Sequence, residues 1–208
     1  GYRLDKCIGQ GSFGDVYAVT SIIDGQSWAV KRLVARRNIE EDSYAIGEIT
    51  ALASIHHPTV VRLHEVLLSR RLACLVMELA PAGNLEMFVQ LSYKSNRNTS
   101  NDKTPSGESF SQILSALNFC HSMDLAHRDI NPSNVLIFNK NLVKLADFGL
   151  CFQCRDAGAK DTSSDSMLKC SDYLGNDHYL APEVRRREPF YAMPADVWSL
   201  GCLLYFML

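Results

Sequence analysis

Three side chains near the middle of the sequence, Asp129, Asn134 and Asp147, have types and a spacing that suit chemistry on phosphate groups. An aspartate can accept or orient a hydroxyl proton, and carboxylate and amide oxygens suit Mg²⁺. Phosphoryl transfer needs little covalent help from a protein, but it needs a hydroxyl aimed in line and cations near the phosphates. We predict Asp129 as the proton acceptor, Asn134 and Asp147 as metal ligands, and Arg128 as a fixed cation.

A glycine-rich segment close to the start could cover the phosphates of a nucleotide. It consists of Gly9, Gln10, Gly11, Ser12, Phe13 and Gly14. The same G-x-G-x-x-G spacing joins a strand to a helix in dinucleotide-binding folds. Here the segment lies between two expected strands, 2–4 and 16–20, and a turn at Asp24-Gly25 leads into a third strand. This context favours a hairpin that covers the phosphates of a nucleotide. It argues against a nucleotide-dependent oxidoreductase, because no helix follows the glycines.

Further motifs complete a known pattern. His127-Arg128-Asp129, with Asn134 five residues later, precedes Asp147-Phe148-Gly149, and Ala181-Pro182-Glu183 follows. Together with the glycine segment and Lys31, these motifs resemble the eukaryotic protein kinases of the serine/threonine type over the whole chain. The resemblance implies an α+β, two-lobed fold, with a strand-rich N-terminal lobe carrying one helix and a mainly helical C-terminal lobe.

The resemblance also implies ATP and Mg²⁺ as cofactors and proteins with serine or threonine acceptors as substrates. Lys31 would hold the α- and β-phosphates, and Glu48, in a segment with helical spacing of apolar residues, would fix Lys31. The other implied ATP contacts are the gatekeeper Met77, the backbone of Glu78 and Ala80, and the apolar residues Val16, Ala29 and Leu136 around the adenine.

By the same resemblance the chain is a partial kinase domain, residues 1–208. Residues 1–80 would form the N-terminal lobe and hinge, and residues 81–208 a truncated C-terminal lobe. We expect an excised fragment covering roughly four-fifths of a domain, within ordinary domain sizes. Residues 92–107 read as a polar surface insertion, 108–122 as a helix, and the apolar run ending at Leu208 as part of a buried helix.

Two positions depart from the serine/threonine kinase pattern. Asn131 replaces a lysine that usually contacts the γ-phosphate, and Asn176 replaces a threonine that usually bonds to that lysine and to the catalytic aspartate. Loss of a cation should lower the rate without abolishing transfer. Sak-type polo-like kinases also lack this lysine and resemble this chain in the short stretches 121–122, 146–150 and 196–202. That resemblance implies a regulator of centriole duplication, and calcium/calmodulin-type and testis-specific serine kinases are only slightly less similar. The alternative is a pseudokinase that binds nucleotide or acts as a scaffold.

Asp172 stands where many kinases carry the threonine whose phosphate pairs with the arginine before the catalytic aspartate. A carboxylate there could partly replace the phosphate as a partner of Arg128. We therefore expect activity to depend less than usual on an upstream kinase. Ser166, Ser171 and Tyr173 are further candidate phosphorylation sites.

Composition excludes little. The chain is 47% hydrophobic and 21% charged with a net charge of −2, so we expect no nucleic-acid partner, and no membrane-spanning segment is evident. Seven cysteines without secretory features indicate reduced thiols and a cytoplasmic protein, at the centrosome or centriole if it is polo-like. Cys151, Cys154 and Cys170 with His178 leave a zinc site as an alternative, although the second half of the usual ligand pattern is missing.

Overall fold

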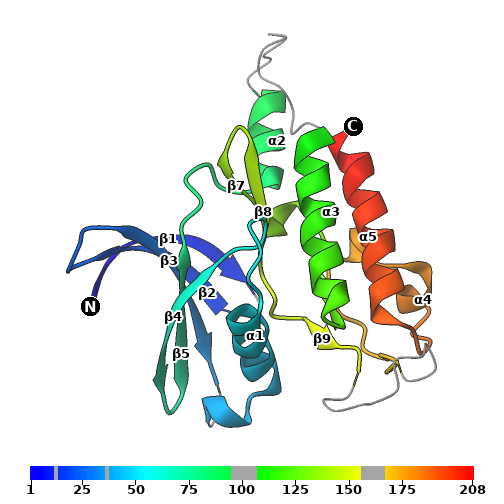
Figure 1. Ribbon diagram of the computed structural model, residues 1–208, viewed down its shortest axis with the longest axis horizontal. Coiled ribbons are helices and arrows are strands. Elements are labelled where there is room, and N and C mark those ends of the chain that lie inside the picture. Colours follow the sequence, from blue (N-terminus) through cyan, green and yellow to red (C-terminus); the bar gives the residue numbers. More distant parts are fainter. Residues whose placement is uncertain (12–13, 36–37, 95–106, 156–166) are drawn as a thin grey trace.

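The computed structural model describes residues 1–11, 14–35, 38–94, 107–155 and 167–208. A five-stranded antiparallel sheet and one α-helix form the first lobe, and a mainly helical second lobe follows (Figure 1). The predicted two-lobed α+β fold is confirmed. The strands of the first lobe are β1 (Tyr2–Gly11), β2 (Gly14–Ser21), β3 (Ser27–Val34), β4 (Leu63–Ser69) and β5 (Leu72–Glu78).

The sheet has the order β1-β2-β3-β5-β4, which places β3 at its centre. Between β2 and β3 the predicted turn is present, closed by a bond from Ser21 N to Gln26 O at 2.8 Å. Strands β1 and β2 are both longer than predicted and extend to the glycine segment, of which Ser12 and Phe13 lie outside the described residues. Gly14 has φ of +140°, and a Cβ there would lie 2.1 Å from the carbonyl oxygen of Arg32. Only glycine lets β2 approach β3 this closely.

Helix α1 (Ser43–Ser54) packs beside the sheet after a short 3₁₀ turn, η1 (Ile39–Glu41). Asp42 and Ser43 both have side chains that suit a helix cap, and Asp42 is the N-cap, accepting from Ala45 N at 3.1 Å. This bond satisfies one of the free N–H groups at the start of the helix. Ala45, Glu48, Ala51 and Leu52 form the buried side of α1, so a charged residue lies within an otherwise apolar face.

The second lobe contains α2 (Leu85–Lys94), α3 (Gly107–Ser122), α4 (Pro182–Arg185) and α5 (Ala192–Met207). The helix predicted for 108–122 is confirmed within one residue of its start. Helix α2 extends into the predicted insertion, whose residues 95–106 lie outside the described residues. Short strands pair β6 (Leu125–Ala126) with β9 (Phe152–Gln153), and β7 (Val135–Asn139) with β8 (Leu142–Leu145). These pairs, and the 3₁₀ turns η2 (Pro132–Asn134) and η4 (Asp177–Tyr179), position the loops between the lobes.

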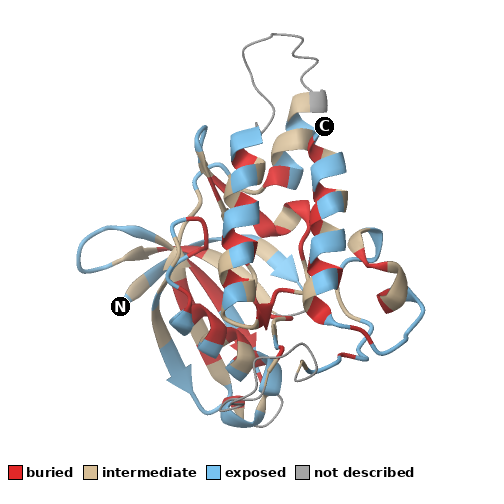
Figure 2. Cartoon of the chain, turned by 45° about the vertical axis from the view of Figure 1, so that its right-hand side comes forward, coloured by how far each residue is buried: buried red, intermediate tan, exposed pale blue. Residues whose placement is uncertain are grey.

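One apolar core runs through both lobes. It includes Leu75 on β5, Leu52 on α1, Phe148 after β8 and Leu203 on α5, all buried. Figure 2 shows the buried residues along the facing sides of the helices and the sheet. The lobes are also joined by backbone, because Leu145 N donates to Thr59 O and Val61 N donates to Leu145 O, each at 2.9 Å. The relative position of the lobes is therefore fixed by packing and by hydrogen bonds.

Helix α5 has one packed side and one exposed side. Leu200 and Leu203 are buried, while Val197, Trp198 and Tyr205 are 58%, 49% and 84% exposed. The sequence predicted that this apolar run would be packed, and this is confirmed for one side only, because no other described element covers the outer side. No described helix is long and apolar enough to cross a membrane.

Candidate active site

Lys31 on β3 lies between two carboxylates from different parts of the fold. Its Nζ atom is 2.7 Å from Glu48 Oε1 on α1 and 2.7 Å from Asp147 Oδ1 in the segment after β8. The side chains of Lys31 and Glu48 are 5% and 2% exposed, whereas that of Asp147 is 35% exposed. The predicted contact between Lys31 and Glu48 is present, and Asp147 joins it from the other lobe.

Each of these groups has a shifted pKa. Burial lowers the pKa of Lys31, but the Asp147 and Glu48 carboxylates outweigh burial and raise it above its usual value. Burial raises the pKa of Glu48, and Lys31 only partly opposes this. Burial also raises the pKa of Asp147, but the Lys31 ammonium and bonds from Lys31 and Gly149 outweigh it and lower the pKa below its usual value. Lys31 and Asp147 are therefore held in their charged forms.

With Glu48 ionised, the three groups carry one negative charge in excess, and this excess suits a cation. Asp147 has the more exposed of the two carboxylates. Asn134, in the turn η2, has an amide oxygen that could bind the same cation. The Asn134 amide nitrogen donates to Asp129 O at 2.9 Å and to Asp129 Oδ2 at 2.8 Å. Among the described residues its amide oxygen has no hydrogen-bond partner. A carboxylate and an amide oxygen form a donor set that suits Mg²⁺.

Asp129 is held on both of its carboxylate oxygens. Oδ1 accepts from Asn131 Nδ2 at 3.0 Å and from Asn176 N at 3.1 Å, while Oδ2 accepts from Asn134 Nδ2. At the two positions that depart from the serine/threonine kinase pattern, Asn131 thus contacts Asp129 through its side chain, and Asn176 contacts it through its backbone N–H. The Asn176 side chain accepts from His178 N at 3.1 Å and makes no bond to Asp129 among the described residues. The lower rate expected from the missing lysine cation stays a prediction. Gly175 makes the contact of Asn176 N with Asp129 possible, since its φ is +108° and a Cβ would lie 2.8 Å from Arg128 O.

The backbone before Asp129 is fixed by a buried carboxylate on α5. Asp196 is 1% exposed and accepts from His127 N at 2.8 Å and from Arg128 N at 2.7 Å. His121 Nε2 is also 2.8 Å from Asp196, a contact that the sequence did not reveal. Arg128 has φ of +65°, which costs a non-glycine residue about 1–3 kcal/mol. The two bonds to Asp196 help to hold this conformation.

His127 joins the loop of Asp129 to the segment of Asp147, the predicted metal ligand. Its ring is fully buried, lies 3.0 Å from Ala146 O through Nε2, and packs edge-on against Phe148 with centroids 4.8 Å apart. The other ring nitrogen accepts from Asp129 N at 3.2 Å. Because a carbonyl oxygen can only accept, Nε2 carries the proton. His127 therefore fixes Asp129 relative to Asp147, a role that sequence reasoning missed because it depends on contacts across the fold.

The predicted adenine residues share one face of the sheet. Val16 is opposite Lys31 between β2 and β3, and Ala29 is opposite Met77 between β3 and β5. Ala29 and Lys31 are two residues apart on one strand, so all four side chains are on the same face. Lys31 contacts Asp147, so this face is directed towards the second lobe. Leu136 lies on β7, in that second lobe, and is half-buried.

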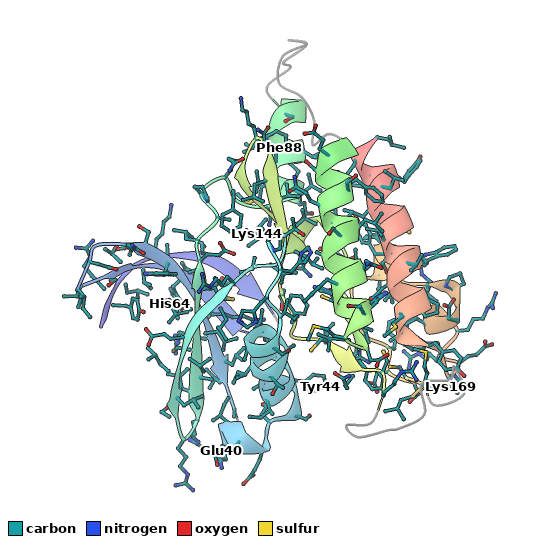
Figure 3. All side chains as sticks on the ribbon, viewed as in Figure 1. Glu40, Tyr44, His64, Phe88, Lys144 and Lys169 are labelled. Atoms are coloured by element: carbon teal, nitrogen blue, oxygen red, sulfur yellow. The ribbon has the colours of Figure 1, made fainter. Side chains whose placement is uncertain are left out.

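The connection after β5 offers backbone groups to a nucleotide base. Both carboxylate oxygens of Glu78 bind Lys144 on β8, at 2.6 and 2.7 Å, and Oε1 also accepts from Arg62 N. Lys144 is labelled on Figure 3. The side chain of Glu78 is thus engaged between the lobes, and its backbone N donates to Arg62 O at 3.2 Å. The predicted contacts of the Glu78 and Ala80 backbone with a base stay a prediction. The connection itself is pinned by a 2.8 Å bond from Ile137 N to Gly83 O.

Asp172 contacts Arg128, as the sequence predicts. The distance from Arg128 Nη1 to Asp172 Oδ2 is 3.3 Å, and the Asp172 side chain is 54% exposed. Arg128 has stronger anchors, since its Nε donates to Leu150 O at 2.6 Å and its guanidinium lies 5.4 Å from the Phe152 ring centre. The candidate phosphorylation site Ser166 lies outside the described residues.

The zinc alternative gains no support from the geometry. Across the described ranges, no group of three or more His, Cys, Asp or Glu side chains is arranged to hold a metal ion. All seven cysteines are free. Cys170 lies 3.6 Å from Arg128 Nη1, and burial raises the pKa of the thiols of Cys151 and Cys154 to about 12. These thiols are therefore protonated near neutral pH.

Comparison with known proteins agrees with this geometry. The family model of the protein kinase domain matches residues 2–208, nearly the whole chain. The chain therefore belongs to the protein kinase domain family.

Two of the curated relatives are plant kinases that this chain matches over its full length. CBL-interacting protein kinase 4 of Oryza sativa subsp. japonica is 34% identical over 210 residues, and CBL-interacting serine/threonine-protein kinase 1 of Arabidopsis thaliana is 33% identical over 213 residues. The chain spans 44% of each of these relatives. They are serine/threonine kinases, and they do not support the predicted polo-like subfamily.

The first prediction concerns Lys31. Lys31→Met should lower the free energy of unfolding by about 3 kcal/mol at pH 7, because Glu48 and Asp147 would lose their shared cation; Asp147 keeps some solvent contact, which limits the effect. The loss should be smaller at pH 5, where the unpaired carboxylates can take up protons. Urea unfolding of the wild type and of Lys31→Met at both pH values measures the difference in free energy of unfolding.

Arg3→Met is the matched control, since Arg3 pairs with Asp5 on the surface, where an ion pair contributes about 0–1 kcal/mol. Equal losses for the two variants, or a larger Lys31→Met loss at pH 5 than at pH 7, would contradict the account.

Proposed function

We propose that the protein carrying this chain is a serine/threonine protein kinase, which transfers the γ-phosphate of ATP to hydroxyl groups of proteins with the help of Mg²⁺. The observation that supports this most directly is the joined arrangement of Lys31, Glu48 and Asp147 beside an Asp129 held on both oxygens. The family and its serine/threonine relatives support the same reading.

In this proposal the residues divide into three tasks. Lys31, fixed by Glu48, binds the α- and β-phosphates, and the hairpin of β1 and β2 covers them with its glycine backbone. Asp147 and Asn134 hold Mg²⁺, which neutralises charge on the phosphates. Asp129 orients the acceptor hydroxyl and receives its proton. Positioning and electrostatic stabilisation supply most of the rate in phosphoryl transfer, so these tasks are sufficient.

The alternative is a pseudokinase that uses the fold to bind nucleotide or partners. Asn131 and Asn176 favoured it in the sequence, because they replace residues that contact the catalytic aspartate or the γ-phosphate. Both residues nevertheless bond to Asp129. The remaining observation in favour of a pseudokinase is the missing lysine cation. Because Lys31 and the candidate metal ligands are in place, we favour a catalytic protein.

The subfamily and the cellular role are narrower questions. The relatives give no support to a centriole role, and it is not part of the proposal. The serine/threonine preference is supported by the names of the relatives and by the segment Tyr179-Leu180-Ala181-Pro182-Glu183, which is typical of that class. We also propose a cytoplasmic location, on the basis of the seven free cysteines.

The test of the function compares the wild-type protein with Asp129→Asn. Asparagine has nearly the same size but cannot accept the hydroxyl proton. We expect wild-type protein to transfer phosphate from Mg-ATP to myelin basic protein, and Asp129→Asn to lose roughly 100-fold or more of this activity while ATP binding stays within twofold. Radiolabel transfer and fluorescence titration with ATP measure the two quantities. Binding of ATP without transfer by the wild type would replace the proposal with the pseudokinase.

The contact of Asp172 with Arg128 carries a further proposal, that activity depends little on phosphorylation by an upstream kinase. The pair is solvent-exposed on the Asp172 side, and exposed ion pairs contribute about 0–1 kcal/mol. Asp172→Ala should therefore lower kcat by about two- to fivefold, and phosphatase treatment of the wild type should leave most activity.

Ser171→Ala is the adjacent control, and it should leave kcat within twofold. Abolished activity after phosphatase treatment, or full activity in Asp172→Ala, would contradict this proposal.

A further inference from the structure

Asn131 has a role at the active site that neither the family nor its relatives assign, and this inference rests on the proposed kinase function. The residue precedes η2, and its side chain is 2% exposed. It occupies the position where serine/threonine kinases usually carry a lysine, so the first question is whether Asn131 can contact a phosphate in the same way.

The hydrogen bonds of Asn131 leave it nothing to offer a phosphate. Its Oδ1 accepts from Ser133 N at 2.9 Å and from the Ser133 hydroxyl. Since a backbone N–H can only donate, this contact fixes the orientation of the amide, and Nδ2 must face Asp129. Nδ2 donates to Asp129 O at 3.2 Å and to Asp129 Oδ1 at 3.0 Å. Both N–H groups and both acceptor positions are therefore in use.

The same hydrogen bonds determine which carboxylate oxygen of Asp129 still has a free acceptor position. A carboxylate has about four acceptor positions, two on each oxygen. Asn131 Nδ2 and Asn176 N fill the positions on Oδ1, and Asn134 Nδ2 fills one on Oδ2. One position remains, and it is on Oδ2. Asn131 and Asn134 belong to the same tight turn, with Asn131 as its N-cap, so the two bonds hold the carboxylate from one rigid piece of backbone.

We propose that Asn131 is a positioning residue for Asp129, which it holds through Oδ1 so that Oδ2 receives the proton of the substrate hydroxyl. In the reaction the hydroxyl oxygen forms a bond to the γ-phosphorus of ATP, and the bond from that phosphorus to the bridging oxygen breaks to release ADP. The hydroxyl proton passes to Oδ2 and later leaves to water. The chain thus replaces a lysine that touches the phosphate with an amide that fixes the base.

The test uses two substitutions that remove the donor but keep the cap of η2. Serine at position 131 can still accept from Ser133 N but cannot reach Asp129, and aspartate keeps the cap while it places an anion beside Oδ1. Steady-state transfer from Mg-ATP to myelin basic protein by the full-length protein gives kcat and the KM for each substrate. Titration with ATP and thermal unfolding are measured on the same samples.

The control is Asn139→Ser. Asn139 makes the same local contact, accepting from the backbone N two residues later at 2.9 Å, but it lies in the exposed turn between β7 and β8. It should leave kcat within twofold. Any loss that is specific to position 131 then reflects the contact with Asp129 and not the loss of a turn.

We expect Asn131→Ser to lower kcat roughly 10- to 100-fold, as displacement of a catalytic group does, and Asn131→Asp to lower it further. The dissociation constant of ATP and the KM for ATP should stay within twofold. An unchanged kcat in Asn131→Ser, or a loss that appears mainly in ATP affinity or thermal stability, would overturn the proposal. If wild-type protein binds ATP without transferring phosphate, the kinase function itself has failed, and that outcome is distinct because it needs no variant.

Discussion

The contact of one ammonium with two carboxylates is the interaction on which the active site depends. Lys31 belongs to the central strand of the sheet, Glu48 to helix α1 of the first lobe, and Asp147 to the second lobe. Burying a charge without a partner is very costly, so the three groups require one another. These three charges therefore help to fix the position of α1 against the sheet. They also help to fix the position of the second lobe near Asp147. The excess negative charge of this set is what a metal ion bound to nucleotide can neutralise.

A second constraint acts on the catalytic loop, where the required backbone is strained. Arg128 and Asp147 both have positive φ, at +65° and +62°. Asp196 holds the first through two backbone N–H groups, and the bonds from Lys31 and Gly149 N hold the second. The His127 ring lies between the two segments and contacts both. Buried groups with well-satisfied hydrogen bonds therefore maintain a geometry that an isolated loop would not adopt.

Local sequence was sufficient to predict several of the elements, whereas the candidate site residues came mainly from motifs shared with a family. The cap at Asp42, the turn before Lys31 and the helix near 108–122 each follow from residue types within a few positions. The pairing of Lys31 with Glu48 and of Arg128 with Asp172 came from resemblance to a family, and both contacts are present. The remaining contacts join residues that are far apart in the sequence, and local patterns do not predict them. No local pattern shows that His121 would reach Asp196, or that the backbone of Asn176 would bond to Asp129.

The departures at Asn131 and Asn176 illustrate why substitution at a motif position is weak evidence for lost function. The sequence shows that a cation and a hydroxyl are missing, but it does not show which atoms take over their hydrogen bonds. Here an amide side chain and a backbone N–H bind the same carboxylate oxygen. What is not recovered is the positive charge, so under the proposed function Lys31, Arg128 and Mg²⁺ would supply the stabilisation of the transferred phosphate.

The most direct test of the central claim is the effect of Mg²⁺ on ATP affinity, measured by calorimetric titration with excess Mg²⁺ and with a chelator. If Asp147 carries the unneutralised charge beside Lys31, Mg²⁺ should tighten ATP binding to the wild type by roughly tenfold or more, about 1.4 kcal/mol. In Asp147→Asn most of this gain should disappear. Equal ATP affinity with and without Mg²⁺ in the wild type, or the same gain in the variant, would contradict the account.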